Sequence, residues 1–453
     1  MYMKTTYSTI LGTGRHTSGS DSIVPNPHFE TQIFYDAKGN IFEKPTLEII
    51  HKFEEITGTK QRHYAAAGKV TSTLAIEAGE DAIRSSGIHR EEIDLIIVAN
   101  NFGDITNRSD KIDLVPSYAS RIKNYLQILN PDVVAYDISL GGPDCITAYK
   151  RIEEYLGLGT KDLVIHINDH EQEDMLEISE YLLPKCSVDK EQLNSIVVVH
   201  YLGSKPSLAC KVRNGLGIHN PNTLAYDIYF GCPGFLQAMI HADVIIKNNR
   251  IKKALIIGAE ILSRVAEPED MDNMLYADGA GAVIMGAIES EQPVGMIFHK
   301  VRSDTYNQQA FMIHMGPAYS PHHDPQELFL KMFGTRVHKY ALNLIPSMIK
   351  DALKEAGLSI EDIAQMVFHQ PNPLMLQEIA RRTFAQFELP VPKNIMPIIG
   401  DTYGNSSVAC IPLILDRMYR KQLDNHTITS GDIIMLLSIG AGMNINIAFY
   451  KVP

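Results

Sequence analysis

One cysteine stands where the sequence predicts that a strand turns into a helix. The apolar run Leu224–Phe230 predicts a strand, and Gly231, Cys232 and Pro233 lead from it into a helical pattern. Proline is favoured in the first turn of a helix. The unpaired N–H groups there favour a thiolate over a thiol and can receive an oxyanion. A lone cysteine is most often a packed core residue, so it is the position of Cys232 that predicts a nucleophile.

Two further candidates for this chemistry lie in the second half of the chain. His369 ends an apolar strand pattern, and a polar loop with a proline follows it. Asn405 lies in the polar turn Gly400–Ser407, ahead of a predicted helix. The turn Ser438–Met443 contains glycines that allow a backbone N–H to approach a ligand closely. A cysteine, a histidine and an asparagine in this order fit acyl transfer through a thioester or, as an alternative, papain-like amide hydrolysis.

Strand and helix patterns alternate along the chain, which predicts an α/β fold of layered sheets covered by helices. The predicted strands are 8–13, 93–99, 133–138, 163–167, 195–200, 224–229, 254–258, 282–287, 366–369, 394–399, 433–438 and 445–449. The predicted helices include 71–86, 117–127, 236–247, 337–356 and 373–387.

One block of the sequence is repeated. Pro116–Pro143 matches Pro206–Pro233 at constant spacing, and Glu91–Val98 is echoed by Glu191–Val198. Such self-similarity predicts a repeated supersecondary unit. Gly142 occupies the place of Cys232 in the first copy, so that corner is predicted to be inert.

Composition narrows the class of protein. The chain has 453 residues, of which 45% are hydrophobic, and it carries a net charge of −12, which disfavours nucleic-acid binding. Five cysteines without CxxC spacing indicate a reducing, cytoplasmic setting. The apolar runs are too short to span a membrane, and Met1–Ser8 lacks the apolar block of a signal peptide. Gly12-Thr13-Gly14 lacks the third glycine of a dinucleotide site, and the His/Asp clusters lack complete ligand sets. We therefore expect no cofactor and no metal.

Four motifs in order resemble those of the beta-ketoacyl-ACP synthase III family of the thiolase-like superfamily. They are Cys232 in FGCPGF, His369 in HQPN, Asn405 in YGNSS and the IGAG turn near the end of the chain. The resemblance covers the whole chain except about a hundred residues of the duplicated region. It implies a thiolase-like αβαβα fold of two pseudo-symmetric halves and a homodimer. The expected halves are residues 1–292, which carry the nucleophile, and 293–453, which carry the histidine and the asparagine. The extra duplicated block is expected at about 105–204.

The resemblance also implies a mechanism. Cys232 takes up an acyl group, and the N–H groups of Cys232 and Gly442 hold the oxyanion. His369 and Asn405 then stabilise the enolate that forms when a malonyl-type thioester loses carbon dioxide. The implied activity is a decarboxylative Claisen condensation in fatty-acid or polyketide-like biosynthesis. The alternatives are an acyltransferase or thioester hydrolase on the same scaffold and a non-catalytic partner subunit.

The sequence departs from the family where coenzyme A is expected to bind. Typical members carry a Trp and an Arg before a TG element, whereas this chain has Lys52–Gly58 there and no Trp. This departure argues against coenzyme A as the carrier of the primer and favours an acyl carrier protein or another thioester, so both acyl-CoA and acyl-ACP are kept as candidate primers. An acyl carrier protein would need cations at the cavity mouth. Lys331, Arg336 and Lys339 are the candidates, and a solvated helix face is the alternative.

Overall fold

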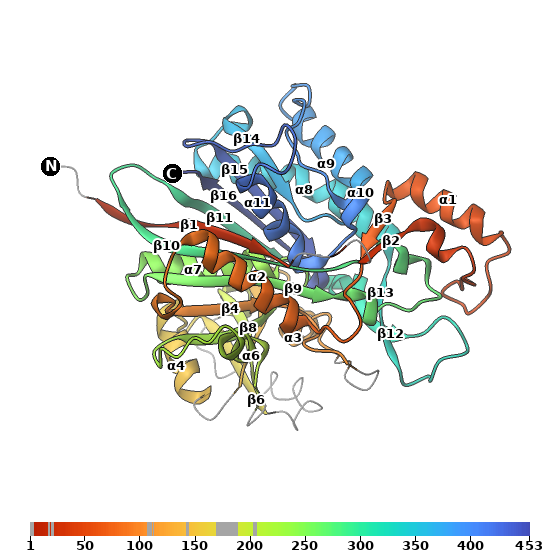
Figure 1. The fold of residues 1–453 in the computed structure, drawn as a ribbon, viewed down its shortest axis with the longest axis horizontal. Coiled ribbons are helices and arrows are strands. Elements are labelled where there is room, and N and C mark those ends of the chain that lie inside the picture. Colours follow the sequence, from red (N-terminus) through yellow and green to blue (C-terminus); the bar gives the residue numbers. More distant parts are fainter. Residues whose placement is uncertain are drawn as a thin grey trace.

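Helices and sheets alternate in αβαβα order through the molecule. The structure, a computed structural model, describes residues 4–16, 19, 22–106, 111, 113–141, 145–168, 189–202 and 206–453. A large sheet is covered on its outer face by α2 (Thr71–Ser86) and α6 (Leu208–Gly215), and a smaller sheet by α8 (Gly334–Ala356) and α9 (Pro373–Ala385). Between the sheets lie α7 (Gly234–Lys247) and α11 (Cys410–Tyr419). Figure 1 shows α8 and α9 on the opposite side of the molecule from α6.

The large sheet has eight strands in the order β1-β10-β9-β4-β8-β5-β7-β6. Their bounds are β1 Thr5–Arg15, β4 Leu95–Ala99, β5 Val134–Leu140, β6 Asp162–Asn168, β7 Ser195–Tyr201, β8 Leu224–Tyr229, β9 Lys253–Ile261 and β10 Asp278–Ser290. β4 pairs in parallel with β8 and β9, and β7 pairs in parallel with β5 and β6. β5 and β8, by contrast, pair antiparallel in the middle of the sheet.

The smaller sheet has four strands in the order β11-β16-β15-β14. Their bounds are β11 Gly295–Ser303, β14 Ile363–Phe368, β15 Ile433–Gly440 and β16 Asn444–Lys451. β14 and β15 are parallel, so their carboxyl ends lie at the same edge of the sheet. That edge carries His369 after β14 and the glycine turn after β15.

Shorter elements complete the fold. At one end of the molecule lie β2 (Ile23–Pro25), α1 (Thr46–Thr57), β3 (Gln61–His63), β12 (Ile313–Pro317) and β13 (Leu328–Met332), grouped at the right of Figure 1. Among the described residues, the α-helices not yet named are α3 (Tyr118–Tyr125), α4 (Cys145–Leu156) and α10 (Gly400–Tyr403).

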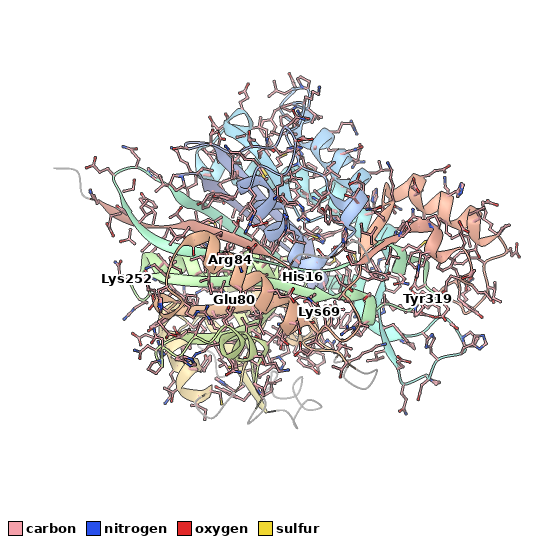
Figure 2. All side chains as sticks on the ribbon, viewed as in Figure 1. His16, Lys69, Glu80, Arg84, Lys252 and Tyr319 are labelled. Atoms are coloured by element: carbon pink, nitrogen blue, oxygen red, sulfur yellow. The ribbon has the colours of Figure 1, made fainter. Side chains whose placement is uncertain are left out.

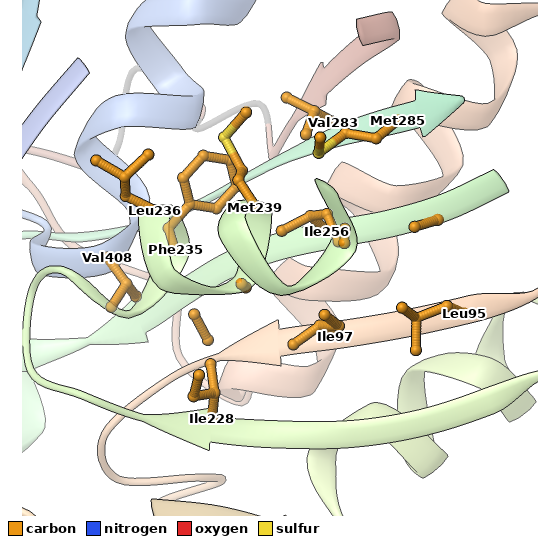
Figure 3. Close-up of a cluster of buried hydrophobic side chains, with 14 of the residues drawn as sticks. Leu95, Ile97, Ile228, Phe235, Leu236, Met239, Ile256, Val283, Met285 and Val408 are labelled. Atoms are coloured by element: carbon orange, nitrogen blue, oxygen red, sulfur yellow. The ribbon is translucent and has the colours of Figure 1, made fainter. Parts of the chain in front are cut away.

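The central strands are buried on both faces, which explains their continuous apolar runs. In β4, Leu95 and Ile97 pack in one core with Phe235 of α7, whereas Ile96 and Val98 pack in another core with α2 and α6. The alternation follows from the period of two in a strand. Figure 3 shows the first of these cores beneath α7.

The structure confirms the layered α/β fold and most predicted elements. The strand predicted at 394–399 is wrong, because this segment is irregular: Ile395 accepts a hydrogen bond from Met366 N, and Pro397 has no N–H to donate to a ladder. The predicted inert corner at Gly142 lies outside the described residues. In the part of the chain described here, no helix is long and apolar enough to cross a membrane.

Candidate active site

Cys232 lies between β8 and α7, at the corner that its sequence predicts. Gly231 there has a φ of 65°, and a Cβ on it would lie 2.7 Å from the backbone nitrogen of Ala441. A Cβ on Gly440 would likewise lie 2.5 Å from the nitrogen of Cys232. The nucleophile corner and the turn after β15 thus pack backbone against backbone, at a separation that only glycine allows.

His369 and Asn405 reach the same place from the second half of the chain. His369 follows β14, and its N–H donates to the carbonyl of Leu437 in β15. The backbone of Asn405 is fixed on both sides, since its N–H donates to Leu275 O and its carbonyl accepts from Ala277 N. The loop that carries Asn405 is therefore bonded to residues 275–277 at this edge.

The imidazole and the amide form one hydrogen-bonded pair. His369 Nε2 lies 3.0 Å from Asn405 Oδ1, which also accepts from Ser407 N at 2.9 Å. An amide oxygen can only accept, so Nε2 carries the proton of His369. Burial lowers the pKa of His369 to about 4, although the bond to Asn405 raises it. The imidazole is therefore neutral near pH 7.

The resting sulfur is a thiol. Burial raises the pKa of Cys232 to about 12, against the lowering effect of the hydrogen bond from Ser407 Oγ, which lies 3.3 Å from Sγ. The expectation that the helix N-terminus favours a thiolate in the free protein is therefore wrong. Desolvation of the sulfur outweighs the partial charge of the helix end.

A cavity of about 580 Å³ connects these groups. Cys232, His369 and Asn405 all line it, so the three predicted side chains share one cavity. Most other lining side chains are apolar, among them Phe53, Phe102, Leu275 and Met375. An apolar cavity with a few convergent polar groups is the usual form of a site for a small organic group.

The second predicted oxyanion donor is placed differently from the expectation. Gly440 and Ala441 line the cavity, but Gly442 is absent from its described lining. A Cβ on Gly442 would instead meet Ser120 Oγ of α3 at 2.5 Å. Gly440 and Ala441 are thus the residues of this turn that line the cavity, and the role of the Gly442 N–H stays a prediction.

The prediction that Lys331 is a surface cation for an acyl carrier protein is wrong, because the residue is buried. Its side chain is 2% exposed, and its ammonium contacts Glu267 and lies 3.0 Å from Asp270. The same ammonium lies 3.5 Å from the ring centroid of Tyr319, which Figure 2 labels near β12 and β13. Because its ammonium is buried and held by these contacts, Lys331 offers no charge to a protein partner.

Arg336 and Lys339 are exposed in the first turns of α8. Their helix neighbours Thr335 and His338 line the cavity. The two cations therefore stand beside its opening.

Sequence reasoning missed a polar network behind the sulfur. Asn101 Nδ2 lies 2.7 Å from Glu260 Oε2 and 3.5 Å from Ser407 Oγ, which in turn contacts Cys232. Burial raises the pKa of Glu260 to about 8. Ser407 follows Asn405 in the YGNSS motif and Glu260 ends the run LIIGAE. The presence of Ser407 and Glu260 in these two motifs was the only sign of the network in the sequence.

Family comparisons agree with the site. Residues 226–304 match the family described as 3-oxoacyl-(acyl-carrier-protein) synthase III, and residues 353–452 match its C-terminal part. Cys232 lies in the first match, and His369 and Asn405 lie in the second.

Similar curated proteins are also named as synthases of type III. Beta-ketoacyl-(acyl-carrier-protein) synthase III of Caldanaerobacter subterraneus subsp. tengcongensis is 31% identical over 274 residues, which cover 59% of this chain and 78% of that relative. The synthase III of Erythrobacter litoralis is 30% identical over 272 residues, which cover 59% of this chain and 79% of that relative. The synthase III of Clostridium perfringens is 27% identical over 324 residues, which cover 68% of this chain and 96% of that relative.

Solved structures share the fold. The 3-oxoacyl-(acyl carrier protein) synthase III of Pseudomonas aeruginosa has a TM-score of 0.63 at 18% identity, with 99% of this chain and 98% of that chain covered. The priming beta-ketosynthase of the R1128 polyketide pathway has a TM-score of 0.61 at 18% identity, with 100% and 98% covered. Motifs, site and relatives together show that this chain belongs to the beta-ketoacyl-(acyl-carrier-protein) synthase III family and is a condensing enzyme of the acyltransferase class.

Proposed function

We propose that this chain loads an acyl group on Cys232 and extends it with a malonyl-type thioester. The observation that carries the proposal is the shared cavity, in which a thiol, a neutral imidazole and a side-chain amide converge. We further infer that residues 1–292 and 293–453 are the two halves that meet there.

In the loading step, Sγ of Cys232 attacks the carbonyl of an acyl thioester. The new C–S bond forms as the old one breaks, and the thiol proton leaves with the released thiol. The N–H groups of Cys232 and Ala441 are the donors that we assign to the transient oxyanion. One such donor is worth about 3–4 kcal/mol of barrier. Because the resting group is a thiol, this step must also move its proton.

In the extension step, the malonyl-type thioester loses carbon dioxide and its carbonyl oxygen becomes an enolate. His369 Nε2–H and the Asn405 amide are the hydrogen-bond donors for that oxygen. A neutral imidazole suits this role, since its donor can strengthen as charge develops without a proton changing hands. The enolate carbon then attacks the acyl-Cys232 carbonyl. The products are carbon dioxide, a beta-keto thioester and the Cys232 thiolate, which takes up a proton from solvent to restore the resting thiol.

The relatives are named for an acyl carrier protein, and we extend that partner to this chain as a proposal. Arg336 and Lys339 are the cations that would meet its acidic surface beside the cavity opening. Replacing both with glutamate is expected to raise KM for a carrier-bound substrate about tenfold or more, because like charges then face each other. The KM for a small thioester without a protein partner should stay unchanged.

The function is tested by product analysis. The purified chain is incubated with an acyl thioester and a malonyl thioester labelled at its methylene carbon, and products are identified by mass spectrometry. The expected product is a beta-keto thioester that carries the label together with the intact acyl chain. Transfer or hydrolysis of the acyl group without a new carbon–carbon bond would replace this proposal with the acyltransferase or hydrolase reading.

A further inference from the structure

The duplicated block repeats, in order, the elements that surround the nucleophile. Its α3, β5, α4 and β6 follow one another as α6, β8, α7 and β9 do further along the chain. The first residues of α3 and α6 are Tyr118 and Leu208, and those of β5 and β8 are Val134 and Leu224. Both pairs are offset by 90 residues, as in the sequence repeat.

The two copies also share their internal hydrogen bonds. The Asp137 carboxylate in β5 accepts from the first two N–H groups of α3, both at 2.8 Å. The Asp227 carboxylate in β8 accepts from the first two N–H groups of α6, at 2.8 and 2.6 Å. Ser117 and Ser207 cap these helices in the same way. The copies are therefore alike in structure as well as in sequence.

Each copy pairs with one strand that precedes the other copy in the sequence. β4 precedes the first copy but pairs with β8 and β9 of the second, and β7 precedes the second copy but pairs with β5 and β6 of the first. The loops agree: Asn220 Nδ2 donates to Glu91 O, and Asn130 Nδ2 donates to Glu191 O. The described strands and helices of the block at about 105–204 thus pair and pack with one another as those of the second copy do.

The two units meet about a local two-fold axis. β5 and β8 are equivalent strands, and they pair antiparallel through Asp137 with Tyr229, Ile138 with Ile228 and Ser139 with Asp227. Each residue of β5 is equivalent to the residue of β8 that lies 90 positions later in the sequence. Exchanging the two strands therefore reproduces the same set of pairs, with the Ile138–Ile228 pair at the axis. The equivalent helices α4 and α7 also contact each other. Self-complementary pairing of equivalent residues is the geometry of a two-fold dimer interface.

The block also reaches the cavity. Val115, just before α3, lines it together with Cys232 and Ala441. Its side chain is 4% exposed, and its carbonyl accepts from Met315 N at 3.0 Å. Val115 is therefore held firmly as part of the cavity wall.

We propose that the block at about 105–204 is an internal partner subunit, which makes within one chain the two-fold contact that a second copy would otherwise make. It completes the Cys232 cavity in cis, and Val115 is a specificity-determining residue for the acyl group. This last point rests on the proposed function. Because β8 has β4 on one side and β5 on the other, neither of its edges is open to another chain. The homodimer that the sequence resemblance implies is thus not needed at this strand.

The first experiment compares mass and loading across dilution. Sedimentation of the full chain is expected to give the mass of one copy, 50.5 kDa. Acyl loading of Cys232 per chain is expected to stay constant from micromolar to nanomolar protein. A dimer whose dissociation on dilution abolishes loading would overturn the internal-partner proposal.

The second experiment places a larger side chain at Val115 in the cavity wall and measures the selectivity for acyl chain length. Val115→Phe is expected to lower octanoyl loading at least tenfold relative to acetyl loading, since even one methylene in an apolar pocket changes selectivity about tenfold or more. Val391→Phe makes the same change at a residue that is 41% exposed, and it should leave the ratio unchanged. An unchanged ratio in a folded Val115→Phe variant would overturn the role of Val115.

A mixing experiment separates action in cis from action in trans. Chains with Val115→Phe are co-expressed with chains carrying Cys232→Ala and an intact Val115. The loading ratio of the first chain should remain that of Val115→Phe alone, and its return toward the wild-type ratio would overturn the proposal. If the wild-type chain loads no acyl group, the proposed function fails, whereas the sedimentation result still decides whether the partner is internal.

Discussion

The protonation state of His369 gives a quantitative prediction for acid conditions. Its pKa falls from an ordinary 6.5 to about 4 because the ring is buried. The folded protein therefore favours the neutral ring. The stability that depends on this neutral ring is fully present above pH 6.5 and is lost as the pH falls from 6.5 through about 4. At about pH 5, linkage of these two pKa values gives a loss of roughly 2 kcal/mol relative to pH 8.

The perturbation is His369→Gln, which removes the titrating group but keeps a polar side chain of similar size. The free energy of unfolding is measured by urea denaturation at pH 8 and pH 5 for both proteins. Wild type should lose about 2 kcal/mol more than the variant, because other groups titrate alike in both. A difference that stays within about 0.5 kcal/mol between the two pH values would refute the buried, neutral imidazole.

Three further substitutions test the site. Asn405→Asp keeps the oxygen that accepts from His369 and Ser407 but loses the amide donor, so decarboxylation should fall about 10²–10³-fold; single-turnover assays should find acyl loading nearly unchanged, and equal loss of both steps would contradict the assigned role. Gly440→Ala puts a Cβ about 2.5 Å from Cys232 N, so it should cost about 1–3 kcal/mol in thermal unfolding and slow loading; wild-type behaviour would argue against the close packing of the two loops. Ser407→Ala removes the hydrogen bond that lowers the pKa of Cys232, so alkylation by iodoacetamide should slow at pH 8, and faster alkylation would contradict the direction of that effect.

The fold and the site residues were accessible from sequence because they depend on local patterns. A short continuous apolar run marks β4, and the glycine, cysteine and proline at 231–233 mark the nucleophile corner. His369 and Asn405 were found because each stands at the end of a recognisable element and inside a motif.

Properties that depend on which residues surround a group in the folded chain could not be predicted from the sequence. The helix end at Cys232 predicts a thiolate, but the burial that raises the pKa of its thiol comes from residues far away in sequence. Lys331 is charged, and only the folded chain shows Glu267 and Asp270 closing around it. The pairing of β5 with β8 could not be read from the repeat, because a repeat does not state which copies pair.

The account depends most on the sulfur of Cys232, and the mass of the acylated protein tests it directly. Wild type and Cys232→Ser are incubated with a panel of acyl thioesters, and the intact proteins and their peptides are weighed by mass spectrometry. We expect one acyl group per wild-type chain, located on the peptide with Cys232, and no thioester-linked group on the variant. An acyl group on another cysteine, or equal loading of both proteins, would contradict the account.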